Sequence, residues 1–328
     1  DKSPLESMRC VHFRFEGPDI KATARNATTT AWVSRSADTT DSGTFSLYAD
    51  VVKKIVGIAQ QSKEPEVSFQ LSADQVIVKI GLKHLLKFKQ INVQFPVEPK
   101  PTDLSQVPEI LITALAAVGR AVGTNPALPQ IAGVYFDPEG YVVGMDGPRL
   151  HLYKVKHELS RSGFIVEANW TDFVVRFLES PDVDLIERQI IASDGQLTVR
   201  SQIISGEYPD YRKLLGKPDA VALISPLELR NAVEIVSEGL SPAVELTFDR
   251  SANVCVQITG EGCHAETWVN AVYPTKEAPA KVKLNARYLA DALACFDFDE
   301  LVAFGVTDRT AVLRTVNGDI RAVIGVQV

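Results

Sequence analysis

Three segments of the chain repeat one pattern, a strand followed by a tight turn and a second strand. In each copy, a phenylalanine and a carboxylate come just before the turn residues, as in a hairpin of a half-buried sheet. The three phenylalanines, Phe15, Phe136 and Phe248, are 121 and 112 residues apart. The copies occupy residues 11–19, 133–140 and 244–253. The repeat predicts three similar folded units of about 110–120 residues each, a common size for a domain.

Helical signals recur in register with these hairpins. Residues 48–61, 170–178 and 287–296 carry apolar stripes that predict amphipathic helices. A second helix is predicted at residues 110–122 and 227–239, the latter with Ser225 and Pro226 as its cap and first turn. A third copy of this second helix would fall before residue 1. Because the chain also begins without Met, we expect a strand and a helix of the first unit to precede it.

A pair of strands follows each helix of the first kind. The pairs are 67–69 with 76–80, 185–190 with 197–199, and 301–306 with 311–313. Alternating strands favour antiparallel sheets with helices covering one face. The fold class is therefore α+β, with three repeated domains at residues 1–103, 104–219 and 220–328.

Charge and composition narrow the functions. A net charge of −7 argues against binding nucleic acid through a broad basic face, although a few cations gathered on one concave surface remain compatible with it. No apolar run approaches the 18 or more residues of a membrane span. The four cysteines are widely spaced and form no Cys-x-x-Cys, which favours buried thiols in a cytosolic protein.

Four motifs occur in one order along this threefold repeat. Met-Asp-Gly-Pro-Arg-Leu at 145–150 resembles Thr-Asp-Gly-His-Arg-Leu, and Tyr-Pro-Asp-Tyr-Arg-Lys-Leu-Leu at 208–215 resembles Phe-Pro-Asp-Tyr-Arg-Arg-Val-Leu. Asn-Ala-Arg-Tyr-Leu at 285–289 and Val-Thr-Asp at 306–308 are similar to Asn-x-x-Tyr-Leu and Leu-Thr-Asp. These are motifs of the bacterial-type DNA sliding clamp, the beta subunit of DNA polymerase III. The resemblance extends along nearly the whole chain.

The resemblance implies a DNA clamp fold that closes as a head-to-tail homodimeric ring, with helices lining a hole and sheets outside. Such a ring encircles double-stranded DNA and slides on it without reading sequence. Cations on the helices would then face the DNA, and the alternative is that they are ordinary solvated residues. They are Lys53, Lys54, Lys63, Arg120, Arg176, Arg230 and Arg287.

The resemblance also implies a cleft between the second and third domains. There the replicative polymerase, the clamp loader and repair proteins would insert short linear peptides. The matching positions are Ile131, Met145, Gly147, Arg149, Leu150, Pro209, Lys213, Leu214, Asn285, Tyr288, Thr310, Val312, Val323, Ile324 and Val326. The alternative for the apolar members is plain domain core. Met145 and Pro148 depart from the family pattern, and residues 324–328 lack its Met-Pro-Met, so the peptide preference is expected to differ.

Residues 81–90 resemble an exposed edge strand of the first domain. Leu85, Leu86 and Phe88 would meet Trp268 and Val269 of the other chain in the ring joint. The alternative is that these residues are core. Lysines interleave with the apolar residues of this segment, as they commonly do on edge strands.

An enzyme is the weaker interpretation. Residues 296–300 hold three carboxylates without the spacing of a calcium loop, and Cys255, Cys263 and His264 lack the spacing of usual zinc sites. Asp146 sits in a predicted turn, and nucleotide-binding and hydrolase motifs are absent. We therefore expect a non-catalytic, cytoplasmic, nucleoid-associated protein without cofactors. A clamp-fold scaffold that binds peptides without loading on DNA is the alternative function.

Overall fold

The computed structural model describes residues 4–62, 66–72, 74–99, 105–106, 110–125, 127–157, 159, 162–237, 242–249, 252–260 and 263–327. The chain forms two compact units. Unit 1 comprises Asp1–Gln106 with Leu178–Gln202, and unit 2 comprises Val107–Phe177 with Ile203–Val328. This grouping places a segment of the predicted second domain in unit 1. The three-domain division at residues 103 and 219 stays a prediction.

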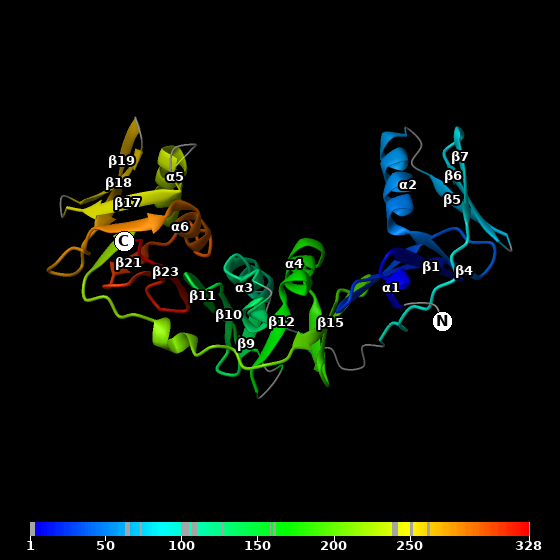
Figure 1. Ribbon diagram of the computed structural model, residues 1–328, viewed down its shortest axis with the longest axis horizontal. Coiled ribbons are helices and arrows are strands. Elements are labelled where there is room, and N and C mark those ends of the chain that lie inside the picture. The colour runs from blue at the N-terminus through cyan, green and yellow to red at the C-terminus, as the bar shows by residue number, and fades with distance from the viewer. Residues whose placement is uncertain are drawn as a thin grey trace. The chain divides into compact units, whose positions relative to one another are not determined.

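Unit 1 combines antiparallel strands with one long helix (Figure 1). Its elements are α1 (Pro4–Ser7), β1 (Cys10–Glu16), β2 (Asp19–Arg25), β3 (Thr29–Ser36), β4 (Gly43–Tyr48), α2 (Ala49–Gln61), β5 (Val67–Leu71), β6 (Gln75–Ile80), β7 (His84–Lys89), β8 (Ser105–Gln106), β13 (Asp182–Ile186), β14 (Gln189–Ser193) and β15 (Leu197–Ile204). The main sheet runs in the order β13–β14–β15–β3–β2–β1–β4. β15 belongs to this sheet through Gln202 and then continues into unit 2.

A separate three-stranded sheet, β5–β6–β7, lies beside α2 in unit 1. The apolar stripe of α2 packs on both sheets, because α2 contacts β1, β4 and β6. Their common core contains Phe13, Phe45, Leu47, Ile55, Val76, Val78 and Ile80. Burial of this stripe stabilises α2 more than its intrinsic helix propensity does.

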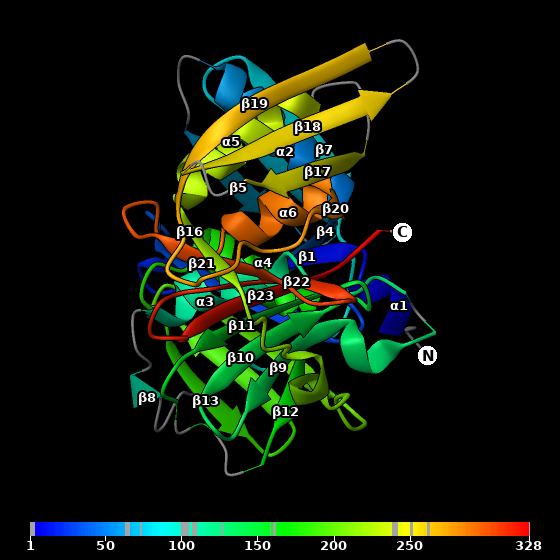
Figure 2. The ribbon, with the colours of Figure 1, turned by 90° about the vertical axis from the view of Figure 1, so that its left-hand side faces the viewer.

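Unit 2 contains two pairs of helices packed on a run of antiparallel strands (Figures 1 and 2). Its elements are α3 (Ile110–Gly119), the 3-10 turn η1 (Pro129–Ile131), β9 (Gly133–Asp137), β10 (Tyr141–Met145), β11 (Arg149–Lys154), β12 (Phe164–Glu167), α4 (Ala168–Phe177), the 3-10 turn η2 (Tyr211–Leu214), β16 (Val221–Ile224), α5 (Pro226–Ser237), β17 (Ala243–Phe248), β18 (Asn253–Gly260), β19 (Cys263–Val272), β20 (Val282–Asn285), α6 (Ala286–Leu293), β21 (Val302–Val306), β22 (Thr310–Arg314) and β23 (Ile320–Gly325). α3 pairs with α4, and α5 pairs with α6.

Strand pairing in unit 2 joins its two repeats directly. The order β12–β9–β10–β11–β23–β22–β21–β16–β19–β18–β17–β20 is antiparallel throughout. The central pairing of β11 with β23 brings together segments that are far apart in the sequence. Side chains on alternate positions of these strands therefore share one face.

The predicted repeat is confirmed in its main elements. The three hairpins are β1–β2, β9–β10 and β17–β18, and helices lie at all five expected places. The predicted strand 185–190 was wrong, because a turn at Glu187, with φ of +54°, separates β13 from β14. Helix ends differ by up to three residues, as at Gly119 and Leu293. No helix among the described residues has the length and apolar character needed to cross a membrane.

Candidate functional site

An apolar cluster occupies the face that β10, β11, β22 and β23 share in unit 2. We call it the groove cluster, and its buried members are Ile131, Val143, Met145, Leu150, Leu152, Tyr211, Val312 and Val323. Leu150 lies directly opposite Val323, which lies opposite Val312 on the next strand. Alternation along the strands explains why residues so distant in sequence share this face. Five residues predicted for the peptide cleft, Ile131, Met145, Leu150, Val312 and Val323, are members.

The segment after β15 crosses the groove cluster and is fixed to the β9–β10 hairpin. Tyr208 stacks on Tyr135 with ring centroids 4.6 Å apart and planes 7° apart. The Tyr211 hydroxyl donates to Oδ2 of Asp137 at 2.7 Å, and Arg212 donates to the same oxygen at 2.7 Å. Burial, and then the hydrogen bond to Asp137, raises the pKa of Tyr211, so the hydroxyl keeps its proton.

The predicted residues of this crossing segment lie at its outer side. Pro209 is half-buried, whereas Lys213 and Leu214 in η2 are exposed. Lys213 forms an ion pair with Asp210 at 3.2 Å, one turn earlier. Such an exposed pair contributes little to stability, so Lys213 can exchange this partner for another.

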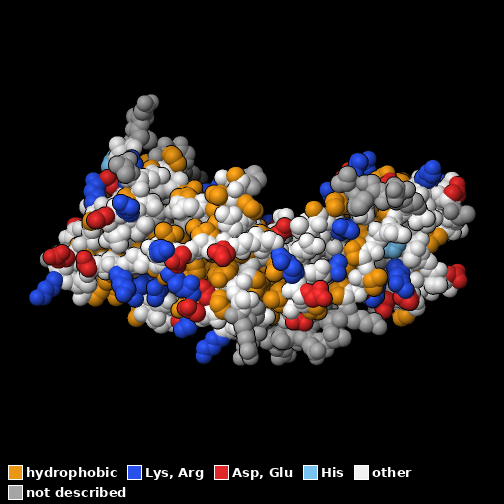
Figure 3. All heavy atoms as spheres, turned by 60° about the horizontal axis from the view of Figure 1, so that its bottom comes forward, with side chains coloured by type: hydrophobic (Ala, Val, Ile, Leu, Met, Phe, Trp, Pro, Cys, Tyr) orange, Lys and Arg blue, Asp and Glu red, His pale blue; other side chains and the backbone are white. Residues whose placement is uncertain are grey.

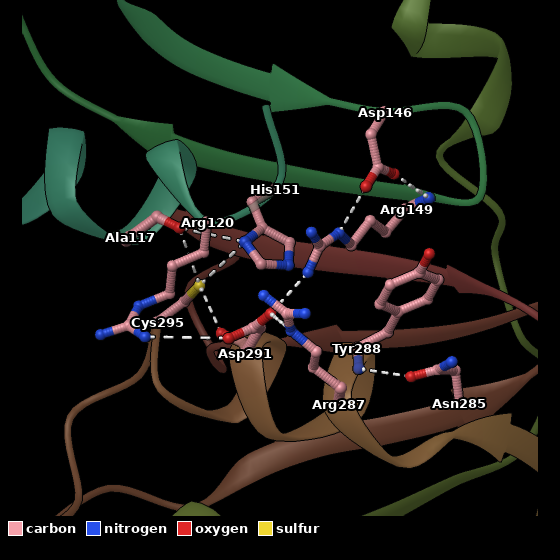
Figure 4. Close-up of polar contacts among 10 residues, drawn as sticks. All are labelled: Ala117, Arg120, Asp146, Arg149, His151, Asn285, Arg287, Tyr288, Asp291 and Cys295. Carbon is pink, nitrogen blue, oxygen red and sulfur yellow. Dashed lines mark hydrogen bonds and ion pairs between the residues drawn. The ribbon is translucent and has the colours of Figure 1, made fainter. Parts of the chain in front are cut away.

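Arg149 ties the β10–β11 turn to α6 (Figure 4). Its Nε donates to Asp146 Oδ2 at 2.8 Å, and its Nη1 donates to Asp291 Oδ2 at 2.6 Å. The guanidinium lies 4.5 Å from the ring centroid of Tyr288, a cation–π contact. Gly147 has φ of +98° in this turn, a conformation that favours glycine. The planar guanidinium of arginine donates from several nitrogens at once, so it can bind both carboxylates better than the single ammonium of a lysine would.

The remaining predicted cleft residues have local partners. Asn285 caps α6, its side-chain oxygen accepting from the Tyr288 amide at 3.1 Å. The hydroxyl oxygens of Thr310 and Thr307 are 2.9 Å apart and share a hydrogen bond. The backbone amide of Val326 donates to the Arg309 carbonyl oxygen at 2.9 Å. Ile324 is fully buried and alternates with Val323 along β23, so its side chain faces away from the groove cluster.

His151 and Cys295 form a buried pair behind Arg149 that the sequence did not indicate (Figure 4). The Cys295 sulfur lies 3.3 Å from His151 Nδ1 and 3.5 Å from the Ala117 carbonyl oxygen. Burial raises the pKa of Cys295 to about 12 and lowers the pKa of His151 to about 4. Both groups are therefore neutral near pH 7, and a buried neutral thiol is not a nucleophile.

The cations predicted to face DNA are mostly paired with carboxylates. Lys53 pairs with Asp50 at 3.9 Å, Arg176 with Asp172 at 2.8 Å and Arg230 with Glu234 at 2.9 Å. Arg120 and Arg287 both approach Asp291, at 3.8 and 4.0 Å. Lys54 has no ion pair with a described residue, and Lys63 lies outside the described residues. These helices therefore present locally compensated charge rather than an uninterrupted basic surface.

β7 and β19 are among the strands with an unpaired edge in the described residues; β5 and β20, which pair with β6 and β17 alone, are others. β7 pairs with β6 alone, and β19 up to Asn270 pairs with β18 alone. Leu85 on β7 and Trp268 on β19 are 55% and 56% exposed. The other residues predicted for the ring joint point inward, since Leu86 and Phe88 pack on the core of unit 1 and Val269 is buried.

Comparison with known proteins gives one consistent answer for the fold. A comparison with models of known protein families found no match. The beta sliding clamp of Staphylococcus epidermidis is 22% identical over 292 residues, which cover 83% of this chain and 75% of that protein. The crystal structure of DNA polymerase III subunit beta from Pseudomonas aeruginosa is similar to this chain with a TM-score of 0.80 and 20% sequence identity. The alignment covers all of this chain and 94% of that chain. The chain has the sliding-clamp fold.

A second clamp structure has a peptide bound. The crystal structure of the Helicobacter pylori beta clamp bound to a DNA ligase peptide is similar to this chain with a TM-score of 0.81 and 16% sequence identity. The alignment covers all of this chain and 93% of that chain. At such identities the clamp fold is shared while side chains differ. The groove cluster, the Arg149 network and the His151–Cys295 pair therefore have to be argued from this chain's own residues. Among the residues that the structure describes, no cluster of three or more His, Cys, Asp or Glu side chains is arranged to hold a metal ion.

Within the clamp fold, His151 makes stability depend on pH. In the unfolded chain a histidine takes up a proton below about pH 6.5, but in the folded protein His151 stays neutral down to about pH 4. Its Nε2 is buried without a hydrogen-bond partner among the described residues. The unfolded state thus binds more protons in this window, and stability is lost as the pH falls from 6.5 to 4. The expected loss from His151 is about 3 kcal/mol.

Urea unfolding at several pH values between 7.5 and 4.5 measures this loss. We expect the free energy of unfolding to depend less steeply on pH in His151→Gln than in the unchanged protein. The variant of an exposed histidine, His264→Gln, should keep the pH dependence of the unchanged protein. Other buried groups titrate equally in all three proteins, so the difference isolates His151. If the free energy of unfolding changes equally steeply with pH in the unchanged protein and in His151→Gln, the buried imidazole of His151 is not neutral as proposed.

Proposed function

We propose that this chain is a DNA polymerase processivity factor without catalytic activity. Two copies close head to tail into a ring around double-stranded DNA, slide on it, and tether the polymerase, clamp loader and repair proteins through short linear peptides. The observation that carries the proposal is the groove cluster, in which five residues selected from the sequence lie together. Its place of action is the cytoplasm, at the nucleoid.

The groove has the makeup that a peptide site needs. Its buried members are apolar and at most 7% exposed, so a peptide would dock along the margin of the cluster, where a few polar groups can orient it. Arg149 is held by Asp146 and Asp291, so the turn between β10 and β11, which carry Met145 and Leu150 of the cluster, is fixed before a peptide arrives. Pre-organisation of this kind reduces the entropy that a short peptide loses on binding.

Ring closure would use the unpaired edges of β7 and β19. An apolar edge strand is an aggregation hazard unless another strand pairs with it. β7 carries Leu85 and Lys87 on its outer face, and β19 carries Trp268 and Glu266 on its outer face. These residues complement one another in both apolar surface and charge. A head-to-tail contact whose rotation closes produces a ring rather than a filament.

Enclosure explains why the helices need little net positive charge. The clamp resemblance implies six pore-lining helices from each chain. Twelve helices packed about 8–10 Å apart make a circle of axes roughly 30–38 Å across, which leaves a hole that passes a duplex. Binding is then topological. Weak, scattered phosphate contacts permit sliding, whereas a strongly basic lining would hold the DNA in place.

Retention on circular DNA tests this function. With a cognate clamp loader and ATP, we expect the protein to remain on nicked circular DNA through gel filtration and to be released when the circle is linearised. Equal retention on circles and linear fragments would indicate ordinary DNA binding. Absence of retention on both would contradict the clamp function.

One observation favours the second candidate, a scaffold that binds peptides without loading on DNA. Five of the predicted DNA-facing cations already have carboxylate partners. The retention experiment separates the two functions, because a scaffold would bind peptides and yet show no retention on circles.

A further inference from the structure

A basic pocket opens at one end of the groove cluster in unit 2. It has a volume of about 300 Å³ and lies between the chain after η2 and the β22–β23 hairpin. Its lining consists of Leu215, Gly216, Lys217, Pro218, Val312, Arg314 and Arg321. Val312 belongs to the groove cluster and Leu215 packs against it, so the pocket and the groove share a wall. Three cations line the pocket and no carboxylate does.

Strand register explains how the apolar face ends in arginines. On β22 and β23 the pair Val312 and Val323 is followed, two residues further along, by the pair Arg314 and Arg321. Alternate residues share a face, so the floor of the groove continues directly into these two guanidinium groups. Figure 3 shows Lys and Arg side chains across the viewed face, with several of them close together beside hydrophobic side chains in its left-hand part.

Nothing in the described part of the chain neutralises this pocket. Like charges directly opposite on neighbouring strands are destabilising. Neither Lys217 nor Arg314 has a described carboxylate within 4 Å, and the nearby Asp319 pairs with Lys154 at 3.2 Å. The turn before β23 also holds one arginine in place. Arg321 Nε donates to the Gly318 carbonyl at 3.2 Å, and a Cβ at Gly318 would come within 3.2 Å of Arg321 Nη2.

We propose that this basic pocket selects partner peptides that carry aspartate or glutamate beside their apolar anchors. Guanidinium groups bind carboxylates through short, charge-assisted hydrogen bonds. The apolar wall, which includes the half-buried Leu215, favours a peptide with apolar side chains over a nucleic-acid backbone. The inference rests on the proposed peptide groove and names the class of peptide that it prefers. The three cations of the pocket, Lys217, Arg314 and Arg321, lie outside the motifs that resemble the clamp family.

Fluorescence anisotropy with two matched peptides tests the inference. The probes are fluorescein-labelled Glu-Glu-Leu-Phe-Glu-Glu and Gln-Gln-Leu-Phe-Gln-Gln, which place the same charge difference on both sides of the anchors. We expect the acidic peptide to bind about ten- to a hundred-fold more tightly at low salt. That preference should shrink at 0.5 M NaCl, because salt screens half-exposed charges.

Variants assign the preference to the pocket. Arg314→Gln with Arg321→Gln should remove the preference and leave binding of the neutral peptide unchanged. Arg35→Gln, an exposed arginine on β3 of unit 1, is the control and should keep the preference. Tyr288→Ala changes a residue predicted for the peptide cleft that does not line the pocket, so it should weaken both peptides alike. If the double variant fails to fold, each single variant and the salt dependence of the unchanged protein still decide whether the pocket causes the preference for the acidic peptide.

The outcomes distinguish the inference from the proposed function. If both peptides bind equally well, the inference is overturned while the groove stands. If neither binds, the peptide groove itself is overturned. If inorganic phosphate or single-stranded DNA displaces the acidic peptide at concentrations comparable with its Kd, the pocket is a general anion site and the inference is wrong.

Discussion

Leu85→Asp combined with Trp268→Asp is expected to convert the dimer into monomers. Both side chains stand on unpaired edges, and both are more than half exposed within a single chain. In a ring joint made by β7 and β19, each aspartate would bury a carboxylate without a partner. The expected penalty, several kcal/mol, corresponds to at least a hundred-fold rise in the Kd of the dimer. Light scattering after gel filtration over a range of concentrations measures it.

The control for this pair is Val316→Asp, in the turn between β22 and β23, where the side chain is 73% exposed. It adds one carboxylate away from both edges and should leave the dimer intact. Leu86 and Phe88 are poor choices for the test, because their packing on the unit 1 core means that aspartates there would also unfold the protein. A double variant that stays dimeric would show that other surfaces form the joint.

Asp137→Ala is expected to destabilise unit 2 by about 3 kcal/mol. The carboxylate is fully buried, with 0% exposure. It accepts hydrogen bonds from the Tyr211 hydroxyl, the Arg212 guanidinium and the Glu139 amide, at 2.7, 2.7 and 2.8 Å. Its removal leaves the Tyr211 hydroxyl buried without an acceptor. The segment that crosses the groove cluster then loses its attachment to the β9–β10 hairpin.

Thermal unfolding measures this effect as a fall in Tm of roughly 6–12 °C. Glu139→Gln is the matched control, because Glu139 also pairs with Arg212, at 3.1 Å, but is 67% exposed. Exposed ion pairs contribute at most about 1 kcal/mol, so its Tm should barely change. Similar shifts for both variants would mean that the buried carboxylate is not what anchors the segment.

The hairpins and helices could be predicted because their signals are local. Alternating apolar residues before turn residues identify β1–β2, β9–β10 and β17–β18, and apolar stripes identify the helices. The turn at Glu187 was missed because Leu185–Ile190 reads as one strand, and no glycine or proline marks its reversal. The grouping of β13–β15 with unit 1 depends on the pairing of β15 with β3, which no local pattern contains.

The sequence selected apolar residues that lie together in the groove cluster, but it did not indicate the polar contacts around them. Motif matches located Met145, Leu150 and Val323. The Arg149–Asp291 contact, the His151–Cys295 pair and the Arg314–Arg321 pair depend on strand register across distant segments. One signal was overlooked, since carboxylates three or four residues from Lys53, Arg176, Arg230 and Arg287 already predict compensated helix charges.

The central claim is that two chains close around a duplex-sized hole, and imaging the purified protein tests it most directly. Cryo-electron microscopy class averages at micromolar concentration should show two-fold symmetric closed rings, with sheets outside and helices around an opening that passes a B-form duplex. Particles that are open single chains, or dimers without a central opening, would contradict it.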